Sequence, residues 1–339
     1  MTKHAFSIHF KKTNHLTLSL VVVVVAIVGT ISLVISHAAT PIVSITANSG
    51  TLSGAASVIT DSTASDGRAV EFGSGSAAPD PSGQPVPIGN QPGWQQEFYD
   101  DFTGDNVAVG QFSNCGTSPQ ICTGLPSALQ SKWWDYPDSW PDTSNNCEYY
   151  PSQTMSISGN IMNMYIHTAS NGTCMTAVPE PLIPGASSSN GQLYGMYSVR
   201  MKSDPVAGYK TAFLLWPDSE NWPEDGEIDF PEGSLDSTVG AYMHYQGATS
   251  GGQQDGYSSN TTYTSWHTYT LEWTPKYVEF LVDGQVIGDS TDTANIPDTP
   301  MHWVLQTESD LNSSKPSASA EGNLQIAWVA IWAYSPGTD

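Results

Sequence analysis

Short segments in which apolar and polar residues alternate fill the chain after residue 94, and they constrain its fold more than any other feature. Such alternation places successive side chains on opposite faces of an extended strand. Helical spacing with end caps is absent apart from a candidate at residues 126–132. Nine segments show the strand pattern: 154–158, 161–167, 194–202, 211–216, 239–245, 267–273, 277–282, 302–307 and 324–332. They predict an all-β domain of two stacked antiparallel sheets.

An almost uninterrupted apolar run occupies residues 16–35, directly after the basic pair Lys11 and Lys12. Small residues at 36–38 offer a cleavage site, so the pattern is typical of a signal peptide. A run of about 20 apolar residues is also long enough to span a bilayer. We therefore expect residues 1–39 to be a signal peptide or a membrane anchor. The rest of the chain is then extracytoplasmic, either secreted or held at the membrane by an N-terminal helix.

Composition divides the remaining chain into three parts. Residues 40–72 are small and β-branched, which predicts a short strand-containing segment that is too short to form a stable sandwich alone. Residues 73–93 include five Pro and five Gly, which indicates an extended linker. We expect residues 94–339 to form the main domain, and we expect it to be a monomer.

The charge balance excludes one class of partner. The chain has 10 basic and 33 acidic residues, and all three lysines of the leader precede residue 39. The exported part therefore has 7 basic and 33 acidic residues, a formal charge of −26. Such an excess of negative charge disfavours binding to nucleic acid, because the phosphate backbone would be repelled.

Four cysteines follow the leader, where disulfides can persist: Cys115, Cys122, Cys147 and Cys174. Three pairings are possible. Proximity favours pairing the first with the second and the third with the fourth, although the sequence alone does not decide between them. A zinc site is the competing interpretation, but the spacings contain neither C-x-x-C nor a matching histidine pair, so we predict no metal at these cysteines.

The segment GEIDFPEG at residues 226–233 places three carboxylates close together. On a strand, Glu227 and Asp229 share a face, whereas Glu232 would point away unless one residue is bulged. Pro231 lies where that bulge is required, and proline is tolerated at bulges. The two glutamate backbones would then lie roughly 13 Å apart. Their carboxyl groups can approach about 5 Å, the separation used by retaining glycosidases.

Two other interpretations of this acidic segment remain. It can be a polar strand face on an acidic protein, although three acids on one face repel each other and are costly unless they are used. It can also be a calcium site, although the segment lacks the Asx-rich loop of hard-cation sites. In the catalytic interpretation, the charge of Asp229 raises the pKa of a neighbouring glutamate and its hydrogen bond positions the nucleophile.

The segment WPEDGEIDFPE at residues 222–232 resembles the catalytic strand of glycoside hydrolase family 16, the laminarinase and lichenase family, in its bulged E-x-D-x-x-E form. Residues 94–104, 194–202 and 266–284 are similar to further strands of that family. The resemblance implies a concanavalin-like jelly-roll β-sandwich and makes residues 94–339 a catalytic domain. It also implies that Glu227 is the nucleophile, that Asp229 is its helper and that Glu232 is the acid/base.

The resemblance also bears on metal binding. Many family members have an aspartate in the last strand that contributes to a structural calcium site, whereas this chain has Ala327. The substitution argues against calcium, and we predict no cofactor and no metal.

Sugar rings stack on aromatic side chains, so a glycosidase cleft needs exposed Trp or Tyr. Trp216 ends an apolar strand and Trp222 lies in the Pro-rich loop before the acidic segment, so both are predicted to bind substrate. Trp134 belongs to an aromatic cluster that is predicted to form a second wall, with a core role as the equal alternative. His244 matches a family position that often lines the cleft. Three other tryptophans alternate with apolar residues and are predicted to be core: Trp273, Trp303 and Trp328.

The family cleaves laminarin, mixed-linkage glucan, agar, carrageenan and xyloglucan. Sulfated galactans need cationic subsites, which this acidic chain has few residues to supply, so a neutral polysaccharide is the expected partner. We predict an exported retaining endo-acting hydrolase of β-1,3- or β-1,3-1,4-glucan that forms a covalent glycosyl-enzyme intermediate. The alternatives are a cell-wall transglycosylase that uses the same residues, and a non-catalytic, membrane-tethered carbohydrate-binding protein.

Overall fold

The computed structural model describes residues 56–60, 68–72, 80–186, 190–311 and 315–337. The chain forms two compact units, Met1–Ser76 and Ala77–Asp339. The described part of the first unit is an antiparallel hairpin of β1 (Ala56–Thr60) and β2 (Arg68–Phe72). The apolar run at residues 16–35 lies outside the described residues. Within the described part of the chain, no helix is long and apolar enough to cross a membrane.

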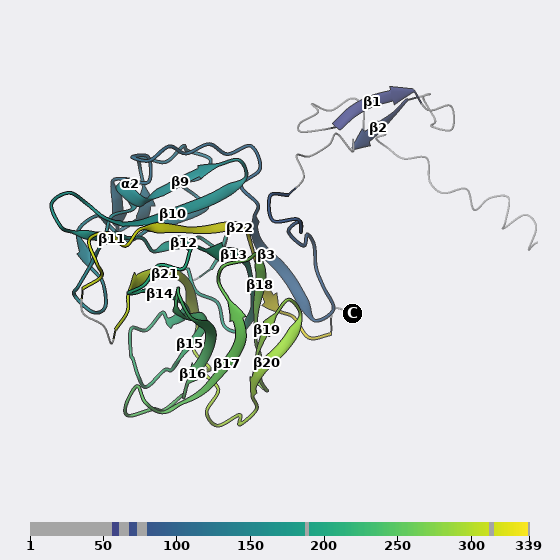
Figure 1. Cartoon of the computed structure of the whole chain (residues 1–339). Helices are drawn as coiled ribbons and strands as arrows, with labels where there is room; N and C mark the ends of the chain where they lie inside the picture. Colours follow the sequence, from purple (N-terminus) through teal and green to yellow (C-terminus); the bar gives the residue numbers. More distant parts are fainter. Residues whose placement is uncertain (1–55, 61–67, 73–79, 187–189, 312–314, 338–339) are drawn as a thin grey trace, which may run out of the picture. The chain divides into compact units, whose positions relative to one another are not determined.

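The second unit is a sandwich of two sheets, as predicted (Figure 1). The smaller sheet has five antiparallel strands in the order β17-β16-β15-β14-β21. Its strands are β14 (Tyr209–Pro217), β15 (Glu227–Ser234), β16 (Thr238–His244), β17 (Gln254–Thr262) and β21 (Met301–Ser309). The acidic segment forms β15, which is the central strand of this sheet.

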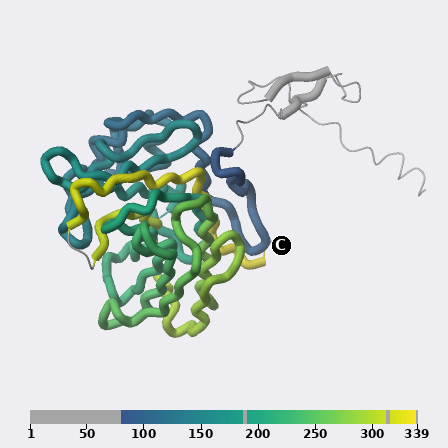
Figure 2. The backbone as a smooth tube through the Cα atoms, viewed as in Figure 1, coloured from purple at the N-terminus to yellow at the C-terminus, as the bar shows by residue number. Residues whose placement is uncertain are grey.

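The larger sheet follows the order β20-β19-β18-β13-β22-β10-β11-β8-β7, with β3 paired to β22 and β9 paired to β10. The long C-terminal strand β22 is the hub of this sheet, since it pairs with β10, β13 and β3 (Figure 2). The strands are β3 (Trp94–Asp100), β7 (Trp140–Pro141), β8 (Glu148–Tyr149), β9 (Met155–Ser158), β10 (Ile161–Thr168), β11 (Cys174–Thr176), β13 (Gly195–Ser203), β18 (His267–Trp273), β19 (Val278–Val282), β20 (Gln285–Ser290) and β22 (Gly322–Tyr334).

Small elements between β3 and β13 in the sequence complete the unit. They are the β4–β5 hairpin (Cys115–Thr117 and Gln120–Cys122), the β6–β12 ribbon (Trp133–Asp135 and Pro179–Pro181) and the one-turn helix α2 (Pro151–Thr154). Two disulfides lie in this region. Cys115 is bonded to Cys122 and Cys147 to Cys174, which is the pairing that proximity favoured.

Alternation in the strands builds the core between the two sheets. In β10, Met162, Met164 and Ile166 are fully buried while the residues between them are partly exposed. Trp273, Trp303 and Trp328 are buried as predicted. All nine predicted strands are present, whereas β17 was missed because its sequence, QDGYSSNTT, has no apolar alternation.

The structure corrects two expectations about local conformation. Residues 126–132 form successive turns rather than a helix: Leu129 packs in the core, but so short a segment does not offset the cost of helix nucleation. Residues 80–93, expected to be part of an extended linker, belong instead to the second unit. They pack along the outer face of the larger sheet.

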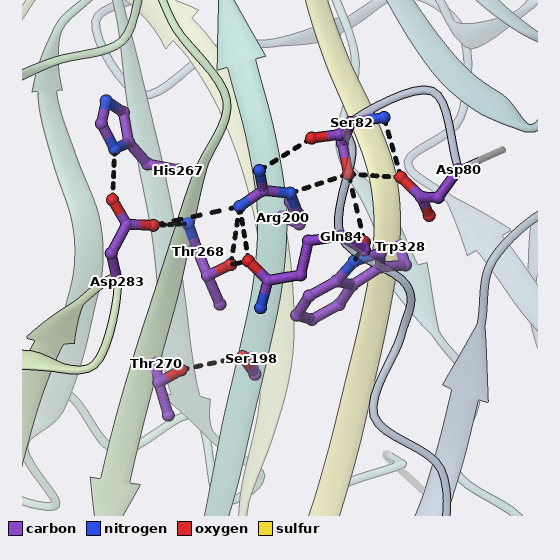
Figure 3. A network of polar contacts seen from close by, with 10 residues as sticks. All are labelled: Asp80, Ser82, Gln84, Ser198, Arg200, His267, Thr268, Thr270, Asp283 and Trp328. Carbon is purple, nitrogen blue, oxygen red and sulfur yellow. Dashed lines mark hydrogen bonds and ion pairs between the residues drawn. The ribbon is translucent and has the colours of Figure 1, made fainter.

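Arg200 of β13 holds this packed segment in place (Figure 3). Its guanidinium donates to Ser82 Oγ (2.7 Å), Ser82 O (2.8 Å), Gln84 Oε1 (3.0 Å) and Thr268 Oγ1 (3.0 Å). Trp328 Nε1 donates to the Gln84 carbonyl at 2.8 Å. The composition of residues 80–93 therefore predicted an extended conformation but not the attachment of these residues to the larger sheet.

Candidate active site

The acidic strand β15 contains the predicted bulge. Against β16, Glu227 pairs with His244 and Asp229 with Tyr242, and the register then shifts before Glu232 pairs with Gly240. The same irregularity appears against β14. As a result, Glu227, Asp229 and Glu232 all line one cleft of about 720 Å³ above the smaller sheet. The prediction that a bulge brings the third carboxylate to the face of the first two is confirmed.

Glu227 and Asp229 form a buried, coupled pair with a histidine beside them. Their side chains share a hydrogen bond, and burial followed by the charge of Asp229 raises the pKa of Glu227 well above its ordinary value. Burial, followed by the charge of Glu232, also raises the pKa of Asp229. His244 Nε2 lies 3.3 Å from Asp229 Oδ2 and 3.9 Å from Glu227 Oε2. The pair therefore retains a proton more readily than two isolated carboxyls would.

Glu232 has a different partner, which the sequence analysis did not identify. Lys210 of β14 donates to Glu232 Oε1, and its ammonium group also lies 3.7 Å from Glu308 Oε1 on β21. Burial alone would lower the pKa of Lys210, but the charges of Glu232 and Glu308 outweigh burial and raise it. The lysine side chain is only 9% exposed. A fixed cation therefore holds the proposed acid/base on the side opposite to His244.

A chain of contacts connects this lysine to the wall of the cleft. Thr143 N donates to Glu308 Oε2 at 3.3 Å, and the neighbouring Asp142 accepts from Ser309 N at 3.0 Å. Asp142 N in turn donates to the carbonyl of Cys147, a disulfide cysteine, at 3.0 Å. The loop that carries Trp140 and Thr143 into the cleft is thus tied both to β21 and to a covalent crosslink.

Trp216, Trp222 and His244 line the cleft, as predicted. The Trp216 and Trp222 rings are stacked, with centroids 6.1 Å apart and an interplanar angle of 18°. Trp222 is 40% exposed and lies against Gly251, where a Cβ atom would be only 2.4 Å from the indole ring. The antiparallel register of β14 and β15 puts Trp216 at the Glu227 end of β15 and Lys210 at the Glu232 end, where the lysine side chain contacts Glu232. The cleft therefore has an aromatic end and a charged end.

The structure does not place Trp134 in the cleft. This residue is 3% exposed, and its Nε1 donates to the Gly116 carbonyl at 2.7 Å. The β6–β12 ribbon is buried on both faces, so neither tryptophan of β6 reaches solvent. The aromatic wall is made instead by Tyr136 and Trp140, whose rings lie 5.5 Å apart. Of the aromatic cluster predicted to form a second wall, Tyr136 and Trp140 line the cleft, whereas Trp134 takes the core role that was its equal alternative.

A second group of buried charges lies near the aromatic end. Glu180 of β12 is 1% exposed and neither carboxylate oxygen has a hydrogen-bond partner among the described residues. Burial raises the pKa of Glu180 to about 7. His302 of β21 pairs with Trp216 and its Nδ1 lies 2.9 Å from Asp218 Oδ1. Burial alone would lower the pKa of His302, but Asp218 and Glu180 raise it.

Comparison with known sequences identifies the family. The sequence profile of the glycosyl hydrolases family 16 matches residues 163–330, which include the bulged strand, both of its neighbours and most of the larger sheet. This chain belongs to glycosyl hydrolase family 16. The resemblance inferred from the acidic segment is therefore confirmed.

Two β-glucanases are among the most similar proteins. The β-glucanase of Paenibacillus polymyxa is 31% identical over 113 residues, which are 33% of this chain and 47% of that protein. The β-glucanase of Acetivibrio thermocellus is 30% identical over 185 residues, which are 51% of this chain and 50% of that protein. This family 16 chain thus spans about half the length of the relatives it matches.

Solved structures agree with the fold. The laminarinase from Rhodothermus marinus superposes with a TM-score of 0.54 at 20% identity, covering 72% of this chain and 98% of the laminarinase. The β-glucanase of Bacillus licheniformis gives 0.52 at 18% identity, covering 70% and 97%. The jelly-roll sandwich that the family resemblance implied is therefore the fold of this chain.

Proposed function

We propose that this chain is an exported retaining endo-β-glucanase that cleaves β-1,3- or β-1,3-1,4-glucan. The observation that carries the proposal is the bulged strand β15, which directs Glu227, Asp229 and Glu232 into one cleft. The names of the similar β-glucanases support the choice of substrate class. A carbohydrate-binding protein without catalysis would have no use for three acids that repel each other on one strand.

In the first step, Glu232 donates a proton to the leaving glycosidic oxygen while Glu227 attacks the anomeric carbon. The C–O bond to the leaving sugar breaks, and a covalent glycosyl ester of Glu227 forms. Glu227 must be ionised for this attack. The hydrogen bond between the two carboxyls raises the pKa of Glu227 and opposes the rise at Asp229, so the proton that the pair retains lies on Glu227 in the free site. It must pass to Asp229 across this hydrogen bond to leave Glu227 as the free carboxylate.

In the second step, Glu232 acts as a base and removes a proton from an incoming hydroxyl, whose oxygen attacks the ester carbon and releases Glu227. Water as the acceptor gives hydrolysis, and a sugar hydroxyl gives transglycosylation. The same residues serve both outcomes, so the acceptor decides between hydrolase and transglycosylase.

The substrate is proposed to lie across the smaller sheet with sugar rings stacked on the exposed face of Trp222 and on the aromatic wall of Tyr136 and Trp140. The cleft has one lysine, Lys210, which already pairs with two carboxylates. A sulfated polymer would find no unpaired cation among the described cleft residues, so a neutral glucan fits better.

Export is proposed from the apolar run at residues 16–35 together with the two disulfides. The Cys147–Cys174 crosslink ties down the loop that carries Trp140 and Thr143 into the cleft, so an oxidising compartment suits the active form. Fractionation and N-terminal sequencing of the mature protein test this proposal. A mature start at residue 39 or 40 in the medium would rule out an anchor, and a cytosolic product would rule out export.

The activity is tested with laminarin, mixed-linkage β-glucan, xyloglucan, agarose and carrageenan, by measuring release of reducing ends and product lengths. Hydrolysis of the first two polymers, with a rapid fall in chain length, is the expected result. Products longer than the substrate without new reducing ends would make the chain a transglycosylase. Binding without any change in the polymer would overturn the enzymatic proposal.

A further inference from the structure

Three atoms able to bind a metal face one another at the nucleophile end of the cleft. The carboxylate oxygens of Glu227 and Asp229 and a ring nitrogen of His244 all lie within 4.8 Å of one another. Asp229 is 3% exposed, and its Oδ2 has no hydrogen-bond partner among the described residues. A buried carboxylate oxygen of this kind carries a desolvation cost that a cation at this position would offset.

The hydrogen bonding of His244 points its second nitrogen at the carboxylates. His244 Nδ1 lies 2.7 Å from the carbonyl of Gly251, which can only accept, so Nδ1 carries the hydrogen. In the neutral imidazole, Nε2 then has the lone pair, and it faces Asp229 and Glu227. A metal-bound histidine has this arrangement, with the other ring nitrogen held by a backbone carbonyl.

The spacing of these atoms fits a tetrahedral ion. Zinc lies about 2.0–2.2 Å from nitrogen and oxygen ligands, so two ligands of a tetrahedral site are about 3.4 Å apart. The two measured separations from Nε2 are 3.3 Å to Asp229 and 3.9 Å to Glu227. Calcium needs six to eight oxygen ligands, which three residues that include an imidazole do not supply.

The surrounding charge also favours a cation at this position. Lys210 pairs with Glu232 and Glu308 at the other end of the strand, which leaves His244 as the basic group beside the Glu227–Asp229 pair. We propose that Glu227, Asp229 and His244 form a binding site for Zn²⁺ or a similar transition-metal ion, with its fourth position open to the cleft, and that the bound ion excludes the substrate. Metal binding stands independently of the proposed function, and only the inhibition rests on it.

Zinc binding is measured on the full chain without a histidine tag, by calorimetry and by competition with a chromophoric chelator at pH 7. We expect one site whose affinity weakens at least about tenfold in His244→Ala and in Asp229→Asn. Affinity should also rise with pH, because protons compete for the same ligands. Calcium and magnesium at the same concentrations should not displace zinc.

His267→Ala is the matched control. His267 Nδ1 lies 2.6 Å from Asp283 Oδ2 on the larger sheet, so it is also a histidine–aspartate pair, but it belongs to no three-residue cluster among the described residues. This variant should bind zinc as the parent does. Zinc bound by histidines of the leader would remain bound in all of these variants. It would therefore not produce the loss of zinc affinity expected for His244→Ala and Asp229→Asn.

Zinc should raise the apparent KM for the hydrolysed glucan without changing kcat, and a chelator should restore the rate. Zinc binding that is unchanged in His244→Ala, or no binding up to millimolar zinc, would overturn the proposed metal site. It would indicate that a proton alone bridges the carboxylates of Glu227 and Asp229 and the ring nitrogen of His244. Binding with the expected losses in a protein that hydrolyses no polysaccharide would instead leave the site standing and overturn the proposed function.

Discussion

The two faces of the sandwich treat buried charge in opposite ways. On the outer face of the larger sheet, Arg200 is 8% exposed, donates four hydrogen bonds to neutral partners and lies 3.9 Å from Asp283 Oδ1 (Figure 3). In the cleft of the smaller sheet, Asp229 is more deeply buried, yet one of its oxygens has no partner among the described residues. The hydrogen bonds of the buried arginine on the outer face stabilise the fold. In the cleft, a buried carboxylate oxygen without a hydrogen-bond partner remains free to bind a ligand or to take part in proton transfer.

The comparison implies that substitutions in the cleft should alter the rate and those on the outer face should alter stability. Glu227→Ala should show the largest effect. Loss of the proposed nucleophile should lower kcat by more than about 10⁴-fold, because no covalent intermediate can form. Added azide should restore turnover and give a product of inverted anomeric configuration, detected by NMR. Unchanged activity in Glu227→Gln would contradict the assignment.

Lys210→Met tests whether the fixed cation positions the acid/base. We expect kcat/KM on glucan to fall by about 10²–10³-fold, because Glu232 loses the group that holds it in the cleft. A dinitrophenyl glycoside needs no proton at its leaving oxygen, so the first step on that substrate should change less than about tenfold. Lys210→Arg keeps the charge and should retain most activity.

A merely structural role for Lys210 would lower both rates equally. Removing the cation from the buried Glu308 and the partly buried Glu232 also destabilises the fold. The circular dichroism spectrum and melting temperature of each variant therefore separate that outcome from misfolding. Equal losses on the polymer and on the activated glycoside would show that Lys210 does not act through Glu232.

Arg200→Met tests the other face. Losing four hydrogen bonds at about 1 kcal/mol each should lower the free energy of unfolding by about 4 kcal/mol, measured by denaturant titration. Below the melting temperature, kcat should not change. Lys202→Met is the control on the same strand, where the lysine makes one cation–π contact with Trp266. A drop in kcat in a folded Arg200→Met protein would contradict the division between the faces.

Local sequence signals were sufficient to predict the bulge in the acidic strand β15. The two-residue period of a strand and the position of Pro231 predicted which acids share a face, and the observed register agrees. The long alternating strands were predictable for the same reason. Their apolar residues record which side of each strand faces the core.

Features that depend on distant partners were not predictable. Lys210 and Glu308 meet only because β14 pairs with β21, almost a hundred residues later in the sequence, and neither residue lies in a recognisable motif. Trp134 was misplaced because alternation gives the face of a strand but not whether another element covers that face. The attachment of residues 80–93 was missed for a similar reason, since composition does not reveal the buried arginine they satisfy.

Glu180 offers the mildest test of the comparison, because it is a buried cleft-side acid that touches no proposed substrate atom. Its pKa is raised by burial from 4.5 to about 7, with the charge of His302 opposing the shift and the charges of Glu220 and Asp218 adding to it. The folded protein therefore binds this proton more tightly than the unfolded chain does. The stabilisation is complete below about pH 4.5 and is lost as the pH rises through 7.

Glu180→Gln replaces the protonated carboxyl by a neutral group of similar shape. In the parent, loss of the proton from Glu180 should lower the free energy of unfolding by about 3 kcal/mol between pH 4.5 and 7.5. The variant should lack that part of the slope and be more stable than the parent at pH 7.5, measured by denaturant titration at each pH. Asp289→Asn, an exposed acid on β20, is the control that changes net charge equally. If the unfolding free energies of the parent and of Glu180→Gln depend on pH in the same way, His302 compensates the buried charge of Glu180 fully. The buried acid near the cleft would then be as well paired as Arg200 on the outer face.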